Sequence, residues 1–221
     1  ESLLMASGLY GRNDDEDVIQ ARQDFDPIDR FLWAAMRFAA SFNGGPRFEP
    51  RGYLTDYYTE EAIKVIEANK DRPFFLYLAH WAPHTPLQAS SEDYEALDHI
   101  DLHRERVYAA MIRSLDRGVG QVMEALRANG LEGNTLVLFT SDNGGAGYIG
   151  IADVNDPYRG WKITLFEGGI RVPMIVKWPG QSSFGAVVDE PVISTDFYPS
   201  LLEMAGLPSQ SDQALDGKSF V

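Results

Sequence analysis

The sequence contains no cysteine. Disulfide bonds, thiolate nucleophiles and cysteine-based zinc sites are therefore excluded within these 221 residues. The sequence also lacks any apolar run close to the roughly 18 residues that a membrane-spanning helix needs, and it shows no signal-peptide pattern. The absence of cysteine excludes thiol chemistry in this stretch, but it leaves the redox compartment undetermined.

Basic residues are scarce. There are 19 Lys and Arg against 33 Asp and Glu, which gives a net charge of −14. This balance argues against a nucleic acid or an anionic membrane as a partner, because both require a basic surface. A small anionic substrate is not excluded, since a local pocket can oppose the charge of the whole molecule.

An apolar run followed by polar residues marks the centre of the sequence. Residues 135–140 read T-L-V-L-F-T and are followed by S-D-N-G-G, which predicts a buried strand that ends just before Asp142 and Asn143. Ligands of open α/β sheets bind beyond the carboxyl ends of strands, and carboxylate and amide oxygens suit Ca²⁺ or Mg²⁺. Asn-Gly is also a common hairpin turn signal. The local pattern leaves both interpretations open.

Glycines continue this region and match G-x-G-x-x-G over residues 145–150. A dinucleotide site requires a helix directly after that pattern. The residues that follow, I-A-D-V-N-D-P-Y-R-G, include Pro157 and have no helical period, so they predict a loop. The pattern therefore gives only weak support to a nucleotide cofactor.

Two further segments carry candidate side chains. His84 follows a second apolar strand, predicted over residues 73–80, and lies in the loop W-A-P-H-T-P, whose prolines restrict the backbone and can aim an imidazole. Lys162 stands near Gly160 in a glycine-rich segment and can approach an oxyanion as a point charge. Taken alone, each also fits an ordinary solvated side chain.

The remaining periodicity predicts helices and one more strand. Helices are expected over residues 27–42, 59–70, 102–129 and 197–205, with Thr59 capping the second of them. A third strand is expected over residues 172–178. Strand, helix and strand between residues 73 and 140 predict a parallel crossover unit, which would bring the His84 loop and the Asp142-Asn143 turn to one sheet edge.

Four segments together resemble the sulfatase family of the alkaline-phosphatase superfamily. They are F-F-L-Y-L-A-H-W-A-P-H-T-P, L-V-L-F-T-S-D-N-G-G, G-W-K-I-T-L-F-E-G-G-I-R-V-P, and S-T-D-F-Y-P-S-L-L-E-M-A-G-L-P followed by L-D-G. Their order and spacing cover roughly residues 55–221, and residues 1–54 correspond to a variable region of that family. The fold that the resemblance implies is α/β, with a mostly parallel sheet flanked by helices.

The resemblance also implies an activity and a role for each candidate residue. The activity is that of a sulfuric-ester hydrolase of the arylsulfatase type, acting with metal assistance on a small-molecule or carbohydrate sulfate ester, in a periplasmic or secreted protein. Asp142 and Asn143 match a pair of Ca²⁺ ligands, for which Mg²⁺ is an alternative. His84 matches the histidine near the leaving oxygen of the ester, and Lys162 matches the lysine that binds the sulfate.

One part of the family pattern has no match in this sequence. Sulfatases use a formylglycine made from the Cys or Ser of a C/S-x-P/A-x-R motif, and neither that motif nor the family's early Asp-Asp pair occurs here. We therefore expect residues 1–221 to be the central part of a single catalytic domain, incomplete at both ends and without its nucleophile segment and C-terminal subdomain. The alternatives are a metal-dependent phosphodiesterase or phosphonate hydrolase, and a non-catalytic binding module derived from a sulfatase.

Overall fold

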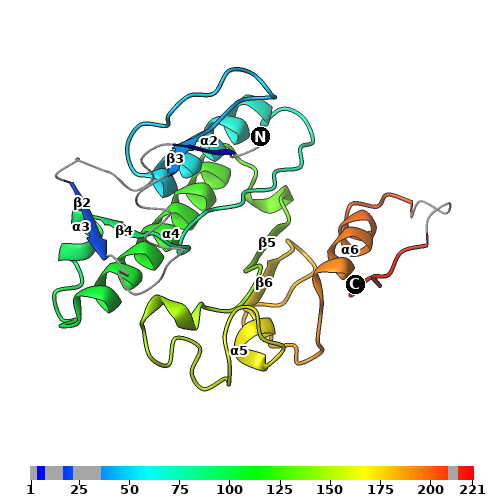
Figure 1. The fold of residues 1–221 in the computed structure, drawn as a ribbon. Helices are drawn as coiled ribbons and strands as arrows, with labels where there is room; N and C mark the ends of the chain where they lie inside the picture. The colour runs from blue at the N-terminus through cyan, green and yellow to red at the C-terminus, as the bar shows by residue number, and fades with distance from the viewer. Residues whose placement is uncertain (1–3, 8–16, 22–35, 209–213) are drawn as a thin grey trace. The chain divides into compact units, whose positions relative to one another are not determined.

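The computed structural model describes residues 4–7, 17–21, 36–208 and 214–221 (Figure 1). The chain divides into two compact units, Glu1–Gly180 and Gln181–Val221, and each is considered by itself. No helix in the described ranges is both long enough and apolar enough to cross a membrane.

Two helices, α2 (Leu54–Asn69) and α4 (His103–Ala128), pack against each other in the first unit (Figure 1). The bounds of α4 differ by one residue at each end from the predicted helix, and Gly130 follows it with a left-handed φ of 71°. The predicted start of α2 was wrong. Thr59 does not cap the helix but lies within it, fully buried, with its hydroxyl donating to the Thr55 carbonyl at 2.9 Å.

The contact between α2 and α4 depends on a glycine. A Cβ atom added at Gly118 of α4 would lie 2.5 Å from Oγ1 of Thr59, whereas one added at Gly120 would meet nothing within 4 Å. We therefore expect Gly118→Ala to lower the free energy of unfolding by about 1–3 kcal/mol through overpacking. Gly120→Ala gains the same helix propensity as Gly118→Ala but causes no clash, so it should raise the free energy of unfolding by about 1 kcal/mol. Denaturant unfolding of both variants tests this difference, and equal shifts of the same sign would contradict it.

A small core lies along the N-terminal half of α4. Strand β4 (Leu87–Ser90) pairs antiparallel with β2 (Val18–Ala21) and leads into the short helix α3 (Ser91–Glu95). The buried residues that form this core are Ala21, Leu87, Ala89, Val107, Ala110, Met111 and Ile149. Since β4 ends at α3, the packing of β4 against α4 fixes the position of the first turn of α3.

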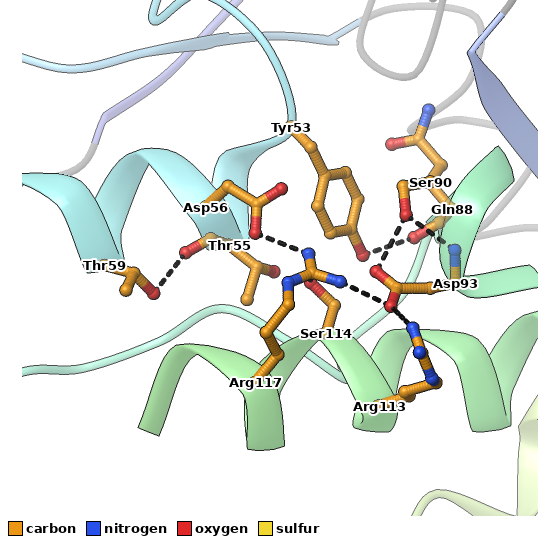
Figure 2. A network of polar contacts seen from close by, with 10 residues as sticks. All are labelled: Tyr53, Thr55, Asp56, Thr59, Gln88, Ser90, Asp93, Arg113, Ser114 and Arg117. Atoms are coloured by element: carbon orange, nitrogen blue, oxygen red, sulfur yellow. Dashed lines mark hydrogen bonds and ion pairs between the residues drawn. The ribbon is translucent and has the colours of Figure 1, made fainter. Parts of the chain in front are cut away.

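A buried carboxylate connects these elements (Figure 2). The Asp93 side chain is fully buried in α3 and forms ion pairs with Arg113 and Arg117 of α4. Ser90 caps α3 by accepting from the Asp93 backbone N–H at 3.1 Å, and its hydroxyl donates to Asp93 Oδ2 at 2.7 Å. Arg117 also reaches Oδ1 of Asp56 in α2 at 2.8 Å. One charged network therefore joins α2, α3 and α4.

The strand pairs differ from the prediction. Strand β3 (Met36–Ala39) pairs antiparallel with β1 (Leu4–Ser7), so the helix predicted over residues 27–42 is wrong at β3, and residues 27–35 lie outside the described residues. Pairing with a distant strand has overridden local helix propensity there. Strand β5 (Val137–Thr140) pairs antiparallel with β6 (Met174–Lys177).

Residues 73–80 contain no assigned strand, and no parallel pair occurs among the described strands. This segment still alternates in exposure as a strand would. Phe74 and Leu76 pack against the cluster around Ile66 and Leu126, while Tyr77 is 81% exposed. The parallel crossover unit predicted for residues 73–140 is therefore not seen in the described part of the chain.

Short helical turns complete both units. In the first unit they are η1 (Glu132–Asn134), η2 (Gly147–Ile149) and α5 (Glu167–Ile170). The second unit contains η3 (Ser194–Asp196) and α6 (Phe197–Met204), which confirms the predicted last helix. Asp196 accepts backbone hydrogen bonds from Lys218 at 2.8 Å and from Ile193 at 3.1 Å, and these donors lower the pKa of its carboxyl group.

Candidate active site

His84 lies in a tight turn directly before β4. Its backbone N–H donates to the Trp81 carbonyl at 3.0 Å, and its own side chain is exposed although Thr85 and Pro86 after it are buried. The buried residues anchor the loop, because Leu87, the first residue of β4, belongs to the core. The exposed imidazole of His84 is thus carried by a loop whose C-terminal end is anchored in the core.

The hydrogen bonds of His84 define which ring nitrogen carries the proton. Its Nδ1 lies 2.8 Å from the Thr85 carbonyl oxygen. A carbonyl oxygen can only accept, so Nδ1 is the donor and Nε2 of the neutral ring is the acceptor. The Nε2 atom lies 3.1 Å from Nζ of Lys162. The structure therefore places the Lys162 ammonium against His84, although the two residues are 78 positions apart in the sequence.

This pair has the charge and the donors to hold an anion. The Lys162 ammonium carries three N–H donors, and among the described residues His84 Nε2 is its hydrogen-bond partner. The remaining donors can bind the oxygens of a sulfate or phosphate group, for which Lys acts as a point charge. Both side chains are at least partly open to solvent, so a ligand can reach them.

Trp81 supports His84 and was not identified from the sequence. Its ring lies 5.3 Å from the His84 ring, and its Nε1 donates at 3.4 Å to the same Thr85 carbonyl that His84 contacts. The available signal was an aromatic residue three positions before the histidine in a proline-rich loop. That signal is weak, because aromatic residues near loops usually serve packing.

Asp142 and Asn143 follow β5 and form a tight turn. The Asn143 amide donates to the Asp142 carboxylate, and the Ser141 hydroxyl donates to the Asn143 carbonyl at 2.9 Å. Asp142 is exposed and Asn143 is half-buried. Among the described residues, no hydrogen bond joins either side chain to His84 or Lys162.

The side-chain oxygens of Asp142 and Asn143 could form part of a site for a hard divalent cation. A carboxylate and an amide oxygen are the ligand types of Ca²⁺ and Mg²⁺, but Ca²⁺ takes six to eight oxygens. Within the described ranges, no group of three or more His, Asp or Glu side chains could hold a metal ion. Asp142 and Asn143 thus match the chemistry of such a cation, and further ligands would have to come from elsewhere.

Backbone contacts join the Asp142-Asn143 turn to the Lys162 segment. The Gly144 N–H donates to the Gly169 carbonyl, and the Lys162 N–H donates to the Gly145 carbonyl, both at 3.0 Å. A Cβ atom at Gly144 would lie 1.8 Å from the Gly168 carbonyl oxygen. Only glycine allows this close approach. The pairs Gly144-Gly145 and Gly168-Gly169 therefore let the turn and the lysine loop come together.

The residue after Lys162 has an unfavourable backbone conformation. Ile163 has a φ of 78° and its side chain is 84% exposed, so a β-branched residue occupies the left-handed region without burying its apolar surface. Ile163→Gly should therefore raise the free energy of unfolding by about 1 kcal/mol, since left-handed strain costs ~1–2 kcal/mol and glycine returns part of that in chain entropy.

The matched control for Ile163 is Ile170→Gly. Ile170 is also exposed, at 61%, but it lies in α5. Glycine should lower stability there by about 0.5–1 kcal/mol. Thermal unfolding of the two variants distinguishes the effects, and a loss of stability in Ile163→Gly would show that the strain is absent.

Comparisons with known proteins identify the family of this chain. A family model described as Sulfatase matches residues 5–207. The uncharacterized sulfatase YdeN of Escherichia coli (strain K12) is 37% identical over 183 residues, which cover 81% of this chain and 32% of the relative. Human steryl-sulfatase is 34% identical over 182 residues, covering 78% of this chain and 30% of that protein. The chain thus spans about a third of the length of these curated relatives.

A solved structure is similar over nearly the same extent. The crystal structure of Ps i-CgsB in complex with k-i-k-neocarrahexaose has a TM-score of 0.74 and 39% sequence identity, and the match covers 83% of this chain and 40% of that one. The His84 loop, the Asp142-Asn143 turn and the Lys162 segment all lie within the residues that the family model matches.

Proposed function

Because this chain belongs to the sulfatase family, we propose that it forms the central part of a sulfuric-ester hydrolase of the arylsulfatase type. The observation that carries this proposal is the contact between Lys162 Nζ and His84 Nε2 at 3.1 Å. Two residues that the resemblance assigns to the sulfate group are thereby brought together by separate parts of the chain.

Lys162 and His84 have distinct roles in this proposal. Cleavage of a sulfate ester develops negative charge on the oxygen that links sulfur to the leaving group, and preorganised donors stabilise such charge. The Lys162 ammonium binds the sulfate oxygens. His84 stands near the leaving oxygen, with its Nδ1–H donated to the Thr85 carbonyl. Its Nε2, which Lys162 leaves when it turns to the sulfate, takes up a proton from solvent and then delivers that proton to the leaving oxygen. The S–O bond to the leaving group breaks as a nucleophile from outside this stretch would bond to sulfur, and that proton neutralises the leaving alkoxide or phenoxide.

Asp142 and Asn143 contribute to a metal site in this proposal. They would supply two oxygen ligands of Ca²⁺, or of Mg²⁺, with the other ligands outside the described residues. When bound, the cation would stabilise negative charge on a sulfate oxygen, and a formylglycine outside this stretch would supply the nucleophile. The contribution of this chain is to fix the turn against the Lys162 loop through the Gly144 and Gly145 backbone.

The domain organisation follows from the same resemblance. We place residues 1–221 within one catalytic domain, with residues 55–221 as its recognisable core and residues 1–54 as its variable region. In the complete domain we expect a mostly parallel sheet to which residues 73–80 contribute a strand. The exposed face of that segment, with Tyr77 at 81%, agrees with this expectation.

The names of related proteins indicate the range of substrates. They include a steryl-sulfatase and an N-acetylgalactosamine-6-sulfatase, and one similar structure holds a neocarrahexaose. We propose a small-molecule or carbohydrate sulfate ester for this protein. The test uses the complete protein on nitrophenyl sulfate, a sulfated carrageenan oligosaccharide, nitrophenyl phosphate and bis-nitrophenyl phosphate. Sulfate release should exceed phosphate ester cleavage, and the reverse order would favour a phosphodiesterase or phosphonate hydrolase.

The isolated 221-residue chain is expected to hydrolyse no sulfate ester above background. The reason is that it has no C/S-x-P/A-x-R motif to supply the nucleophile. Methylumbelliferyl sulfate gives a sensitive assay, and the complete protein serves as the positive control. Turnover by the purified segment would overturn the assignment of the nucleophile to a formylglycine outside it.

A further inference from the structure

A single side-chain amide connects the turn and the lysine loop of the candidate active site. Asn155 is half-buried and lies between η2 and Lys162. Its Oδ1 accepts from the Gly145 N–H at 2.7 Å, and its Nδ2 donates to the Gly145 carbonyl at 2.9 Å and to the Gly160 carbonyl at 3.1 Å. The amide thus pairs with Gly145 in the way that a neighbouring strand would.

The partners of Asn155 lie next to the proposed functional residues. Gly145 is two positions after Asn143, and Gly160 is two positions before Lys162. The Gly145 carbonyl also accepts from the Lys162 N–H at 3.0 Å. Both acceptor sites of that carbonyl are therefore filled, one by Asn155 and one by the lysine loop. Any movement of Asn155 would be transmitted to both segments.

Local packing leaves little freedom for this arrangement. A Cβ atom added at Gly145 would lie 2.9 Å from Oδ1 of Asn155 and 3.0 Å from a methyl group of Val154. A Cβ atom at Gly160 would lie 2.5 Å from Oγ1 of Thr164, and Gly160 has a left-handed φ of 85°. Asn155 is therefore in contact with Gly145, next to the turn. Its second partner, Gly160, is itself closely packed against Thr164.

We propose that Asn155 is a positioning residue, which holds the Asp142-Asn143 turn and Lys162 in register so that one bound sulfate ester can meet both. It does not contact the substrate and acts only through the backbone of Gly145 and Gly160. The effect on catalysis rests on the proposed function. The fastening of the two loops rests on the hydrogen bonds alone.

Replacing the Asn155 amide with a carboxylate tests its positioning role directly. Asn155→Asp keeps the size of the side chain and its acceptor for the Gly145 N–H. It removes the two donated hydrogen bonds and sets a carboxylate oxygen against the carbonyl oxygens of Gly145 and Gly160. These contacts become repulsive, so the two loops should move apart while the rest of the chain stays folded.

A matched control is available at Asn129. This residue follows α4, and its Nδ2 donates to the Ala125 carbonyl at 2.9 Å. Asn129→Asp makes the same chemical change and also removes a donated hydrogen bond to a carbonyl. It lies in a different part of the chain from the Asp142-Asn143 turn and the Lys162 loop, and nothing assigns it to the site.

The experiment compares both variants in the complete protein. Asn155→Asp should lower kcat/KM for nitrophenyl sulfate by about 10²-fold, because small displacements of positioned groups cost that much. Asn129→Asp should remain within about twofold of the wild type, since it leaves both loops in place. Hydrogen exchange of residues 142–162 should be faster in Asn155→Asp and unchanged in Asn129→Asp. A kcat/KM for Asn155→Asp within about twofold of the Asn129→Asp value would overturn the positioning role.

The two proposals fail in different ways. A complete wild-type protein without sulfatase activity would refute the proposed function. Hydrogen exchange would then still decide whether Asn155 fastens the two loops, because that measurement needs no substrate. Unchanged exchange of residues 142–162 in Asn155→Asp would overturn the inference irrespective of activity.

Discussion

Replacing Lys162 with alanine in the complete protein is expected to lower kcat/KM for an aryl sulfate by about 10²–10³-fold. The substitution removes the ammonium that lies 3.1 Å from His84 Nε2 and, in the proposed function, binds the sulfate. The backbone N–H of residue 162, which donates to the Gly145 carbonyl, is retained. The loop should therefore keep its path, and the bound metal should stay at the wild-type level in elemental analysis.

Asp142→Ala provides the contrast. This change removes a negatively charged oxygen ligand, so Ca²⁺ content and kcat should fall together in the same assays. Excess Ca²⁺ should not restore the activity of Lys162→Ala, since that variant has lost no metal ligand. If Asp142→Ala kept its full metal complement and its activity, residues 142–145 would be an ordinary turn, and the metal ligands would have to be sought elsewhere.

The largest expected effect on stability is at Asp93. Asp93→Ala should lower the free energy of unfolding by about 3 kcal/mol, because removing one partner of a buried ion pair leaves the others uncompensated. The value is at the low end of the usual range, since Arg113 and Arg117 keep 42% and 29% of their side-chain surface exposed and remain partly hydrated. The variant also loses its hydrogen bond with the Ser90 hydroxyl (Figure 2).

Glu92 is the control for Asp93. It is the preceding acidic residue in the first turn of α3, but its side chain is exposed. Glu92→Ala should cost no more than about 0.5–1 kcal/mol, which is the usual value for a charge near a helix N-terminus. Equilibrium unfolding in urea measures both variants. Equal losses in the two would show that the Asp93 network contributes no more than a surface charge.

The helices α4 and α6 were predicted well from the sequence. The bounds of α4 agree closely because its apolar residues recur at helical spacing over many turns and Gly130 ends the pattern. The last helix, α6, was found from its flanking signals, the Ser-Thr-Asp sequence before it and Gly206-Leu207-Pro208 after it. Both signals are local, so the sequence around each helix contains nearly all the information that specifies it.

Features that depend on distant contacts were not predicted. The sequence pattern gives Thr59 as a helix cap, but α2 begins earlier because that residue is buried against Gly118 of α4. Strand β3 is extended because it pairs with β1, far away in the sequence. The antiparallel partner of β5 could not be inferred either, since strand direction is a property of the pair and not of one segment.

In the candidate site too, residues with a local sequence signal were identified, whereas contacts that depend on the path of a loop were not. The sequence and its family resemblance identify His84, Lys162, Asp142 and Asn143 as residues of interest, and the structure places the first two in contact. The supporting contacts of Trp81 and Asn155 could not be anticipated. Each depends on the path of an irregular loop, and loop paths have no periodic pattern from which they can be predicted.

The spacing of these contacts in the sequence predicts the order in which they form. The backbone hydrogen bonds and the Asn155 amide join segments within residues 144–169, so they close short loops at low entropic cost. His84 and Lys162 are 78 residues apart, and the chain between them contains all of α4. The turn and the lysine loop can thus form early and locally. We expect the contact of His84 with Lys162 to form later, once α4 has packed, because it closes a much longer loop.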